Sequence, residues 1–167
     1  MEVCALSLGS NVGDGRARLR AALRDLARLP RTRVLRVSPL LRSSPVGVRG
    51  QRDYLNCCAL VRTGLSPAGL LVEAKRLEAR AGRRPGPRWR PRALDIDVLF
   101  YGRRRLRGPW LEVPHPRALE RRFVLEGLAA LRPGWRPPVA PARTLRAWRA
   151  RLNDSSQNVT VVKPPAR

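Results

Sequence analysis

Two aspartates stand two residues apart in the apolar stretch PRALDIDVLF, residues 91–100. In a β-strand, side chains at positions i and i+2 point to the same face. Asp95 and Asp97 would therefore share one face of a strand, roughly 6–7 Å apart, with apolar side chains on the other face. Because two carboxylates this close repel each other, an arginine, solvent or a metal ion must accompany them.

Basic residues and a histidine flank the two aspartates. The preceding segment, RRPGPRWRPR at residues 83–92, is rich in arginine, and its prolines and glycine exclude regular structure. The only histidine, His115, follows in VPHPR. Mg²⁺ binds one or two carboxylates together with phosphate oxygens, two ions about 3.5–4 Å apart can bridge such a pair to a triphosphate, and arginine neutralises phosphate charge. These residues predict a magnesium–nucleotide site; the alternative is a solvated strand edge or an arginine pair.

A second group of residues suits a flat heterocycle. In DYLNC, Tyr54 and Asn56 share a strand face by the same spacing, and Phe123 follows on an apolar helix. An aromatic ring can stack on a heterocycle, while an amide can donate and accept hydrogen bonds at its edge. Taken alone, Tyr54 and Phe123 are more typical of residues that pack in the hydrophobic core.

Length and composition indicate one globular domain with a packed interior. The chain has 167 residues, of which 43% are hydrophobic, and no apolar run approaches the length of a membrane span. Three cysteines without metal-binding spacing are typical of free thiols in a reducing cytoplasm. The net charge of +23 is almost entirely arginine, spread along the chain, and this favours a composition bias over a nucleic-acid patch.

The expected elements follow the order β-α-β-β-α-β, the split βαβ arrangement. We expect strands at 2–9, 33–42, 54–62 and 93–101, and helices that begin after Asp14 and Ser66. Two further helices are expected at 116–132 and 142–152. They would cover the second sheet face and give a three-layer α-β-α sandwich. Residues 1–152 would form the single domain, and residues 153–167 a flexible tail.

Taken together, six motifs resemble the 6-hydroxymethyl-7,8-dihydropterin pyrophosphokinase family of folate biosynthesis. They are LGSNVGD, SSPVG, DYLN, RWRPRALDIDVLFYG, VPHPR and RRFVL, in the family's order and near its spacing. The resemblance implies a ferredoxin-like α+β fold. It also implies Mg²⁺-dependent transfer of diphosphate from ATP to the pterin alcohol, with release of AMP. A cytoplasmic enzyme is expected, favoured as a monomer, with no membrane or specific nucleic-acid partner.

The resemblance also assigns roles to individual residues. Asp95 and Asp97 would bind magnesium, as two ions with ATP, and Arg83 and Arg92 would be catalytic. The implied ATP site is Glu78, Arg83, Arg88, Trp89, Arg92, Val98 and His115. The implied pterin site is Ser43, Ser44, Val46, Tyr54, Asn56, Trp89 and Phe123.

Three positions depart from the family pattern. Arg90 replaces the usual glycine before Pro91, Trp110 stands where an arginine is frequent, and Glu112 replaces a small polar residue. A relative without activity is therefore one alternative. Another is a basic RNA- or DNA-binding domain, but only 5% of the residues are aromatic, and paired acids repel phosphate.

Overall fold

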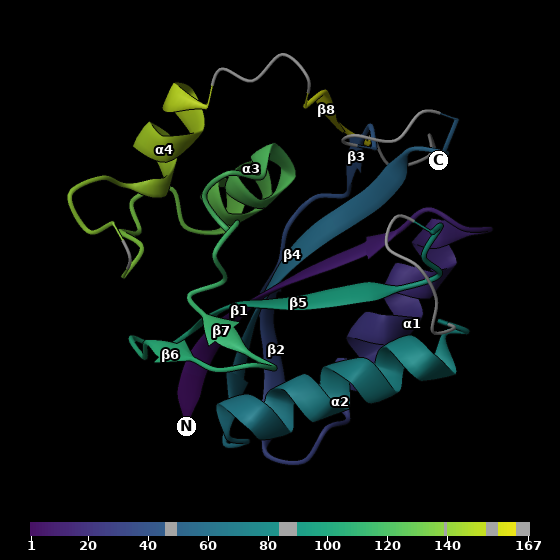
Figure 1. Ribbon diagram of the computed structural model, residues 1–167, viewed down its shortest axis with the longest axis horizontal. Helices are drawn as coiled ribbons and strands as arrows, with labels where there is room; N and C mark the ends of the chain where they lie inside the picture. The colour runs from purple at the N-terminus through teal and green to yellow at the C-terminus, as the bar shows by residue number, and fades with distance from the viewer. Residues whose placement is uncertain (46–49, 84–89, 139, 153–156, 163–167) are drawn as a thin grey trace.

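A six-stranded antiparallel sheet forms the middle layer of the molecule (Figure 1). The computed structural model describes residues 1–45, 50–83, 90–138, 140–152 and 157–162. The strands of this sheet are β1 (Glu2–Ser10), β2 (Thr32–Val37), β3 (Leu41–Ser43), β4 (Tyr54–Thr63), β5 (Asp95–Tyr101) and β8 (Val159–Val161). Their order is β5-β1-β4-β3-β8, and β2 also pairs with β4. Each βαβ unit thus has a strand of the other unit between its own two strands, as the split arrangement requires.

Helices α1 (Gly15–Ala27) and α2 (Pro67–Arg80) pack on one face of this sheet. Both begin at the residues expected from the sequence. The Asp14 side chain accepts the Ala17 N–H at 2.9 Å, and the Ser66 hydroxyl accepts the Gly69 N–H at 3.1 Å. The two helices and this sheet face enclose one apolar core, which includes Leu6, Leu26 and Ile96.

Helices α3 (Arg122–Leu131) and α4 (Leu145–Arg151) cover the opposite face. They enclose a second core that includes Leu125 and Leu145, and the Phe100 ring meets the Trp135 ring edge-on at 4.9 Å between centroids. The expected three-layer α+β sandwich is confirmed. No helix in the described part of the chain is long and apolar enough to cross a membrane.

Several element boundaries differ from those expected. The strand expected at 33–42 is divided into β2 and β3, because Pro39 has no N–H to donate to the sheet. The helix expected at 116–132 begins only at Arg122, because residues 115–120 form separate turns. A short hairpin of β6 (Leu106–Arg107) and β7 (Glu112–Val113) was not expected.

Part of the segment expected to be a flexible tail is a sheet strand. In β8, Val159 is paired with Ser43 and Val161 with Leu41 of β3. The run VTVV is rich in β-branched residues, which favour a strand, and β3 provides the open edge for it. The expectation of a tail is therefore wrong for residues 157–162.

The three cysteines are buried free thiols, and we expect them to be unreactive in the folded protein. Burial raises the pKa of Cys4 and of Cys57 to about 12 each, and raises that of Cys58 further. Since only the thiolate attacks a disulfide reagent, a chromogenic reagent at pH 8 should react slowly with the native protein. Denaturant should release all three equivalents. Fast modification of one thiol in the native protein would contradict this.

Candidate active site

Strand β5 presents the two aspartates together on one face. Ile96 and Val98 are buried in the core beneath α2, while the side chains of Asp95 and Asp97 are 25% and 21% exposed on the other face. On the neighbouring strand β1, Gly9 is paired with Asp95 and Ser7 with Asp97. These two neighbours are small, so they leave space above the carboxylates.

Arginines from three different segments accompany the carboxylates. Arg83 and Arg92 reach Asp95 Oδ1 at 2.6 and 2.7 Å, and Arg121 reaches Asp97 Oδ2 at 2.5 Å. The sequence left arginine, solvent or a metal ion as possible partners of the two carboxylates. In the structure, both Asp95 and Asp97 are paired with arginine. Each pair is partly exposed, so an incoming anion can reach the guanidinium groups.

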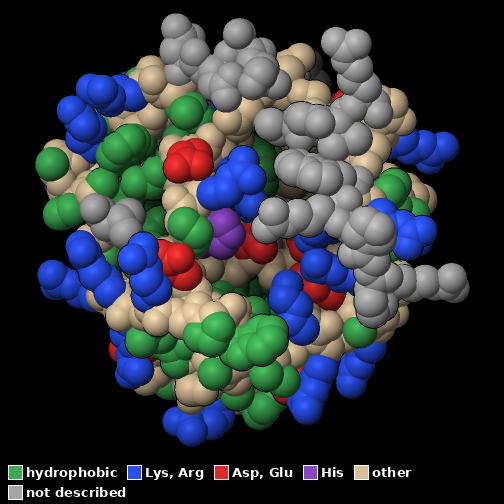
Figure 2. Space-filling view, in the orientation of Figure 1, with side chains coloured by type: hydrophobic (Ala, Val, Ile, Leu, Met, Phe, Trp, Pro, Cys, Tyr) green, Lys and Arg blue, Asp and Glu red, His purple; other side chains and the backbone are tan. Residues whose placement is uncertain are grey.

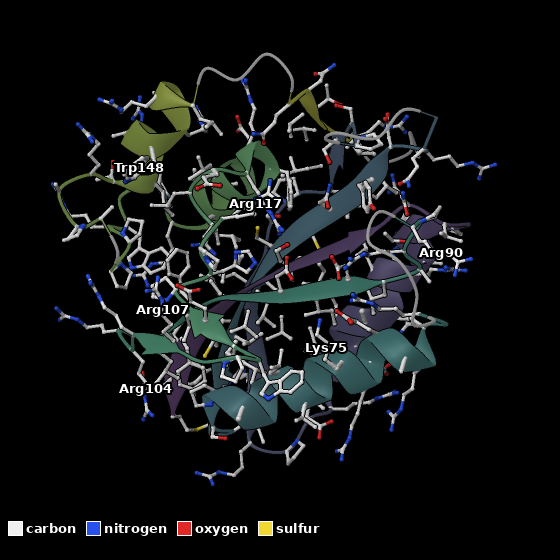
Figure 3. The ribbon with its side chains drawn as sticks, viewed as in Figure 1. Lys75, Arg90, Arg104, Arg107, Arg117 and Trp148 are labelled. Atoms are coloured by element: carbon white, nitrogen blue, oxygen red, sulfur yellow. The ribbon has the colours of Figure 1, made fainter. Side chains whose placement is uncertain are left out.

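Glu78 anchors this network from α2. Its side chain is 1% exposed, and its Oε1 accepts the Ile96 N–H at 2.7 Å and the Lys75 ammonium at 2.9 Å. Its Oε2 binds Arg83. Figure 3 shows Lys75 extending from α2 toward β5. Arg83 is therefore held between a buried carboxylate and Asp95, which fixes its position before any substrate arrives.

His115 lies close to Asp97, the second of the two aspartates. Its Nε2 is 4.0 Å from Asp97 Oδ2, and its Nδ1 accepts the Arg117 N–H at 3.1 Å. Burial lowers the pKa of His115, and Arg121 and Arg117 lower it further against the opposing effect of Asp97. Burial alone would raise the pKa of Asp97, but Arg121 and His115 outweigh it and hold this pKa below its usual value. Asp97 is therefore ionised at neutral pH.

One cavity joins the carboxylates to the residues expected to hold a ring. It opens between the β3–β4 side of the sheet and the start of α3. Its lining includes Ser43, Ser44, Tyr54, Asn56, Asp95, Asp97, Arg117, Arg121, Phe123, Gln157 and Val159. Figure 2 shows a hollow near the middle of this face, with acidic, basic and histidine side chains around it. Two groups of residues that are separate in the sequence thus form a single site.

The floor of the cavity is polar and closely packed. Asn56 is 3% exposed, and its Nδ2 donates to Ser43 Oγ at 2.9 Å. A Cβ atom at Gly9 would lie 2.8 Å from Asn56 Oδ1, so only glycine fits there without displacing the amide. Burial raises the pKa of Tyr54, which keeps its phenol neutral beside this amide.

Not every expected residue lines the cavity. Four residues expected at the nucleotide lie outside the lining and are connected to it through Asp95 and Asp97: Glu78, Arg83, Arg92 and His115. The Val98 side chain is 3% exposed and lies in the core on the opposite face of β5. Val46, Arg88 and Trp89 lie outside the described residues. Sequence analysis missed Arg121, although the motif RRFVL places it two residues before Phe123. It also missed Gln157 and Val159, for which no sequence signal exists because only folding brings them to this cavity.

The three departures from the family pattern lie away from the cavity. Arg90 is exposed and extends outward at the periphery in Figure 3. Trp110 is 87% exposed beside the β6–β7 hairpin, and Glu112 pairs with Arg107 at 3.3 Å. None of the three lines the cavity formed by the described residues.

The fold is that of a ferredoxin-like α+β protein, and a family match makes the chain a transferase of the pyrophosphokinase class. Residues 5–133 match the model of the family described as 7,8-dihydro-6-hydroxymethylpterin-pyrophosphokinase (HPPK), and the chain belongs to this family. The family works in folate biosynthesis, so the resemblance seen in the sequence motifs is confirmed.

Individual relatives agree with the family match. A 2-amino-4-hydroxy-6-hydroxymethyldihydropteridine pyrophosphokinase of Pseudomonas aeruginosa is 42% identical over 80% of this chain and 82% of its own. The Bacillus subtilis protein of the same name is 37% identical over 77% of each chain. A Plasmodium falciparum HPPK-DHPS crystal structure has a TM-score of 0.71 at 15% identity. The match covers 89% of this chain and 45% of that structure's chain. At this level of sequence identity, the likeness shows only the fold.

Proposed function

We propose that the protein transfers diphosphate from ATP to the hydroxymethyl group of 6-hydroxymethyl-7,8-dihydropterin and releases AMP. One observation carries the proposal: a single cavity is lined both by the arginine-paired Asp95 and Asp97 and by Tyr54, Asn56 and Phe123. A diphosphate transfer needs the phosphates and the acceptor ring side by side, and this cavity has the residues for both. A nucleic-acid-binding domain has no need of a cavity with two carboxylates.

The pterin part of the site is assigned to the β3–β4 side and to α3. Tyr54 and Phe123 would stack on the two ring faces, while Asn56, Ser43 and Ser44 would bind the ring edge. The Asn56 amide is already held by Ser43, so it meets a ligand in a fixed orientation. This preorganisation favours binding because little side-chain freedom is lost.

The nucleotide part is assigned to the carboxylates and arginines. Two adjacent carboxylates fit Mg²⁺, and we propose two ions bound with ATP at Asp95 and Asp97. No group of three or more His, Cys, Asp or Glu side chains that could hold a metal occurs in the described part of the chain. Phosphate oxygens of ATP would complete the ligand sets, as is usual for Mg²⁺ bound with a nucleotide. When bound, Mg²⁺ would neutralise phosphate charge and align the phosphate oxygens.

The remaining chemistry is positioning and charge neutralisation. The substrate hydroxyl would attack the β-phosphorus of ATP and release its proton to solvent. A new O–P bond forms, and the bond between the β-phosphorus and the oxygen that leaves with AMP breaks. Arg83 and Arg92 would contact the transferred phosphates, with Glu78 and His115 beside the nucleotide. Burial alone would lower the pKa of Arg92, but Asp95 outweighs burial and raises it, so Arg92 keeps its positive charge.

The wider assignments follow from the same proposal. We propose that residues 1–152, together with the strand β8 that completes their sheet, form one catalytic domain. This domain would act in the cytoplasm as a monomer without a membrane or a specific nucleic-acid partner. The charge of +23 is then a property of composition.

The nucleotide product tests the proposed reaction directly. We expect AMP, formed one-for-one with the pterin diphosphate, when the protein is incubated with ATP, Mg²⁺ and the reduced pterin alcohol. Chromatography of the nucleotides separates AMP from the ADP that a simple phosphoryl transfer would give. Omission of the pterin and chelation of Mg²⁺ are the controls, and either should stop AMP formation. Production of ADP, or of AMP without pterin, would overturn the proposal.

A further inference from the structure

Helix α3 begins beside the cavity without a capping side chain of its own. The residue at its N-cap is Arg121, whose guanidinium binds Asp97 instead of the helix backbone. The first backbone N–H groups of a helix have no partner inside the helix, and they need one from elsewhere. Arg121 and Phe123 both line the cavity, so their positions depend on what holds this turn.

Gln157, far along the chain, binds this turn on both sides of Arg121. Its Oε1 accepts the Arg122 N–H at 2.7 Å, and its Nε2 donates to the Glu120 carbonyl at 2.9 Å. One amide thus satisfies the first N–H of α3 and a carbonyl of the preceding turn. The bond to Arg122 does what a capping side chain would otherwise do.

The residues after Gln157 connect the same turn to the opposite wall of the cavity. Asn158 accepts the Ser44 N–H through its carbonyl at 3.2 Å, and Val159 is paired with Ser43 in the sheet. Figure 1 shows β8 beside β3. The segment 157–161 therefore links the β3 wall, which carries Ser43 and Ser44, to the start of α3.

We infer that Gln157 is a positioning residue for the reaction: it caps α3 from a distance and so fixes Arg121 and Phe123 at the cavity. This inference rests on the proposed function for the identity of the substrate. Gln157 acts through the α3 backbone: its hydrogen bonds to the Arg122 N–H and the Glu120 carbonyl hold the turn from which Phe123 lines the cavity. The alternative is that the same bonds stabilise the fold and leave substrate binding unchanged.

The test is Gln157→Met, which keeps the length of the side chain and removes both hydrogen bonds. Pterin affinity is measured by calorimetry at 25 °C in the presence of Mg²⁺ and a non-hydrolysable ATP analogue, and thermal melting is recorded beside it. We expect the pterin dissociation constant to rise about 5- to 30-fold, judged from the loss of one helix cap. Amide hydrogen exchange of the first turn of α3 should also accelerate in the ligand-free protein.

Two further variants separate positioning from general stability. Ser66→Ala removes a comparable cap from α2, whose N-terminus does not line the cavity among the described residues. Its melting temperature should fall while its pterin affinity stays native. Gln157→Glu keeps the acceptor for the Arg122 N–H at a helix N-terminus but loses the donor to the Glu120 carbonyl, so its affinity should fall clearly less than that of Gln157→Met.

Each outcome of these measurements either supports the inference or overturns it. Native affinity in Gln157→Met, whatever its melting temperature, overturns the inference, and so does an equal loss in Gln157→Met and Gln157→Glu. An equal loss in Ser66→Ala would show that affinity follows stability alone and would also overturn it. If the unmodified protein fails to bind the pterin, the proposed function fails. In that case, amide hydrogen exchange of the first turn of α3 still tests the role of Gln157, because it needs no ligand. Exchange that is unchanged in Gln157→Met would show that Gln157 does not hold this turn.

Discussion

Asp97→Asn is expected to lower the turnover of the enzyme by roughly 10²–10³-fold, equivalent to about 3–4 kcal/mol of transition-state stabilisation. The neutral amide keeps the shape of the side chain but is a poor substitute for a charged ligand of Mg²⁺. It also leaves Arg121 without its carboxylate partner at 2.5 Å. AMP release at saturating ATP and pterin measures the effect.

The stability of the same variant distinguishes a functional carboxylate from a structural one. The Asp97–Arg121 pair is partly exposed, at 21% and 24% of the two side chains, and removal of Asp97 also relieves its repulsion with Asp95. We therefore expect a loss of about 1 kcal/mol or less, which is a few degrees in melting temperature for a chain of this size.

The control is Asp25→Asn, which removes an exposed ion pair with Arg28 on α1 and should leave turnover unchanged. A large fall in the melting temperature of metal-free Asp97→Asn, with turnover retained in the folded fraction, would contradict the assignment of Asp97 as a magnesium ligand. Asp97 would then be a structural partner of Arg121.

Phe123→Ala is expected to weaken pterin binding by about 1–3 kcal/mol, the usual effect of losing one stacked aromatic face. At 1.4 kcal/mol per tenfold, this is roughly 5- to 150-fold in the dissociation constant. ATP binding should change much less, because the phosphate contacts are assigned to other residues. Calorimetry with each ligand in turn measures the difference.

Phe123 also packs against the core beneath α3, so its removal has a stability cost that must be kept apart from the binding effect. Titrations well below the melting temperature of the variant achieve this. Trp110→Ala is the matched control, since this exposed aromatic residue lies outside the cavity lining and its loss should leave both affinities native. Equal losses for pterin and ATP in Phe123→Ala would indicate a core role instead.

The arrangement of the main elements could be predicted because local signals agreed with one another. Asp14 and Ser66 cap helices where expected, and the alternation around Asp95 and Asp97 places apolar residues in the core and acids on the open face. Boundaries were missed where the signal was not local. The late start of α3 depends on turns at residues 115–120, and β8 depends on an edge that only the folded β3 provides.

The types of the site residues could be predicted from the sequence better than the contacts between them. The spacing showed that the aspartates needed partners, but three kinds of partner remained open. The family motifs pointed to Arg83 and Arg92, but the spacing did not show that Arg121 would be the partner of Asp97. Gln157 reaches α3 from 35 residues away, a contact that periodicity cannot reveal.

The carboxylates beneath these arginines also act as internal counterions in a chain of net charge +23. Most of the surface arginines are solvated, and dissolved salt screens their attraction for anions within about 8–10 Å at ordinary ionic strength. The arginines of the site are partly buried and already held in place, so salt screens them less. Rising ionic strength should therefore release loosely bound polyanions such as nucleic acid before it releases a phosphate ligand from the cavity.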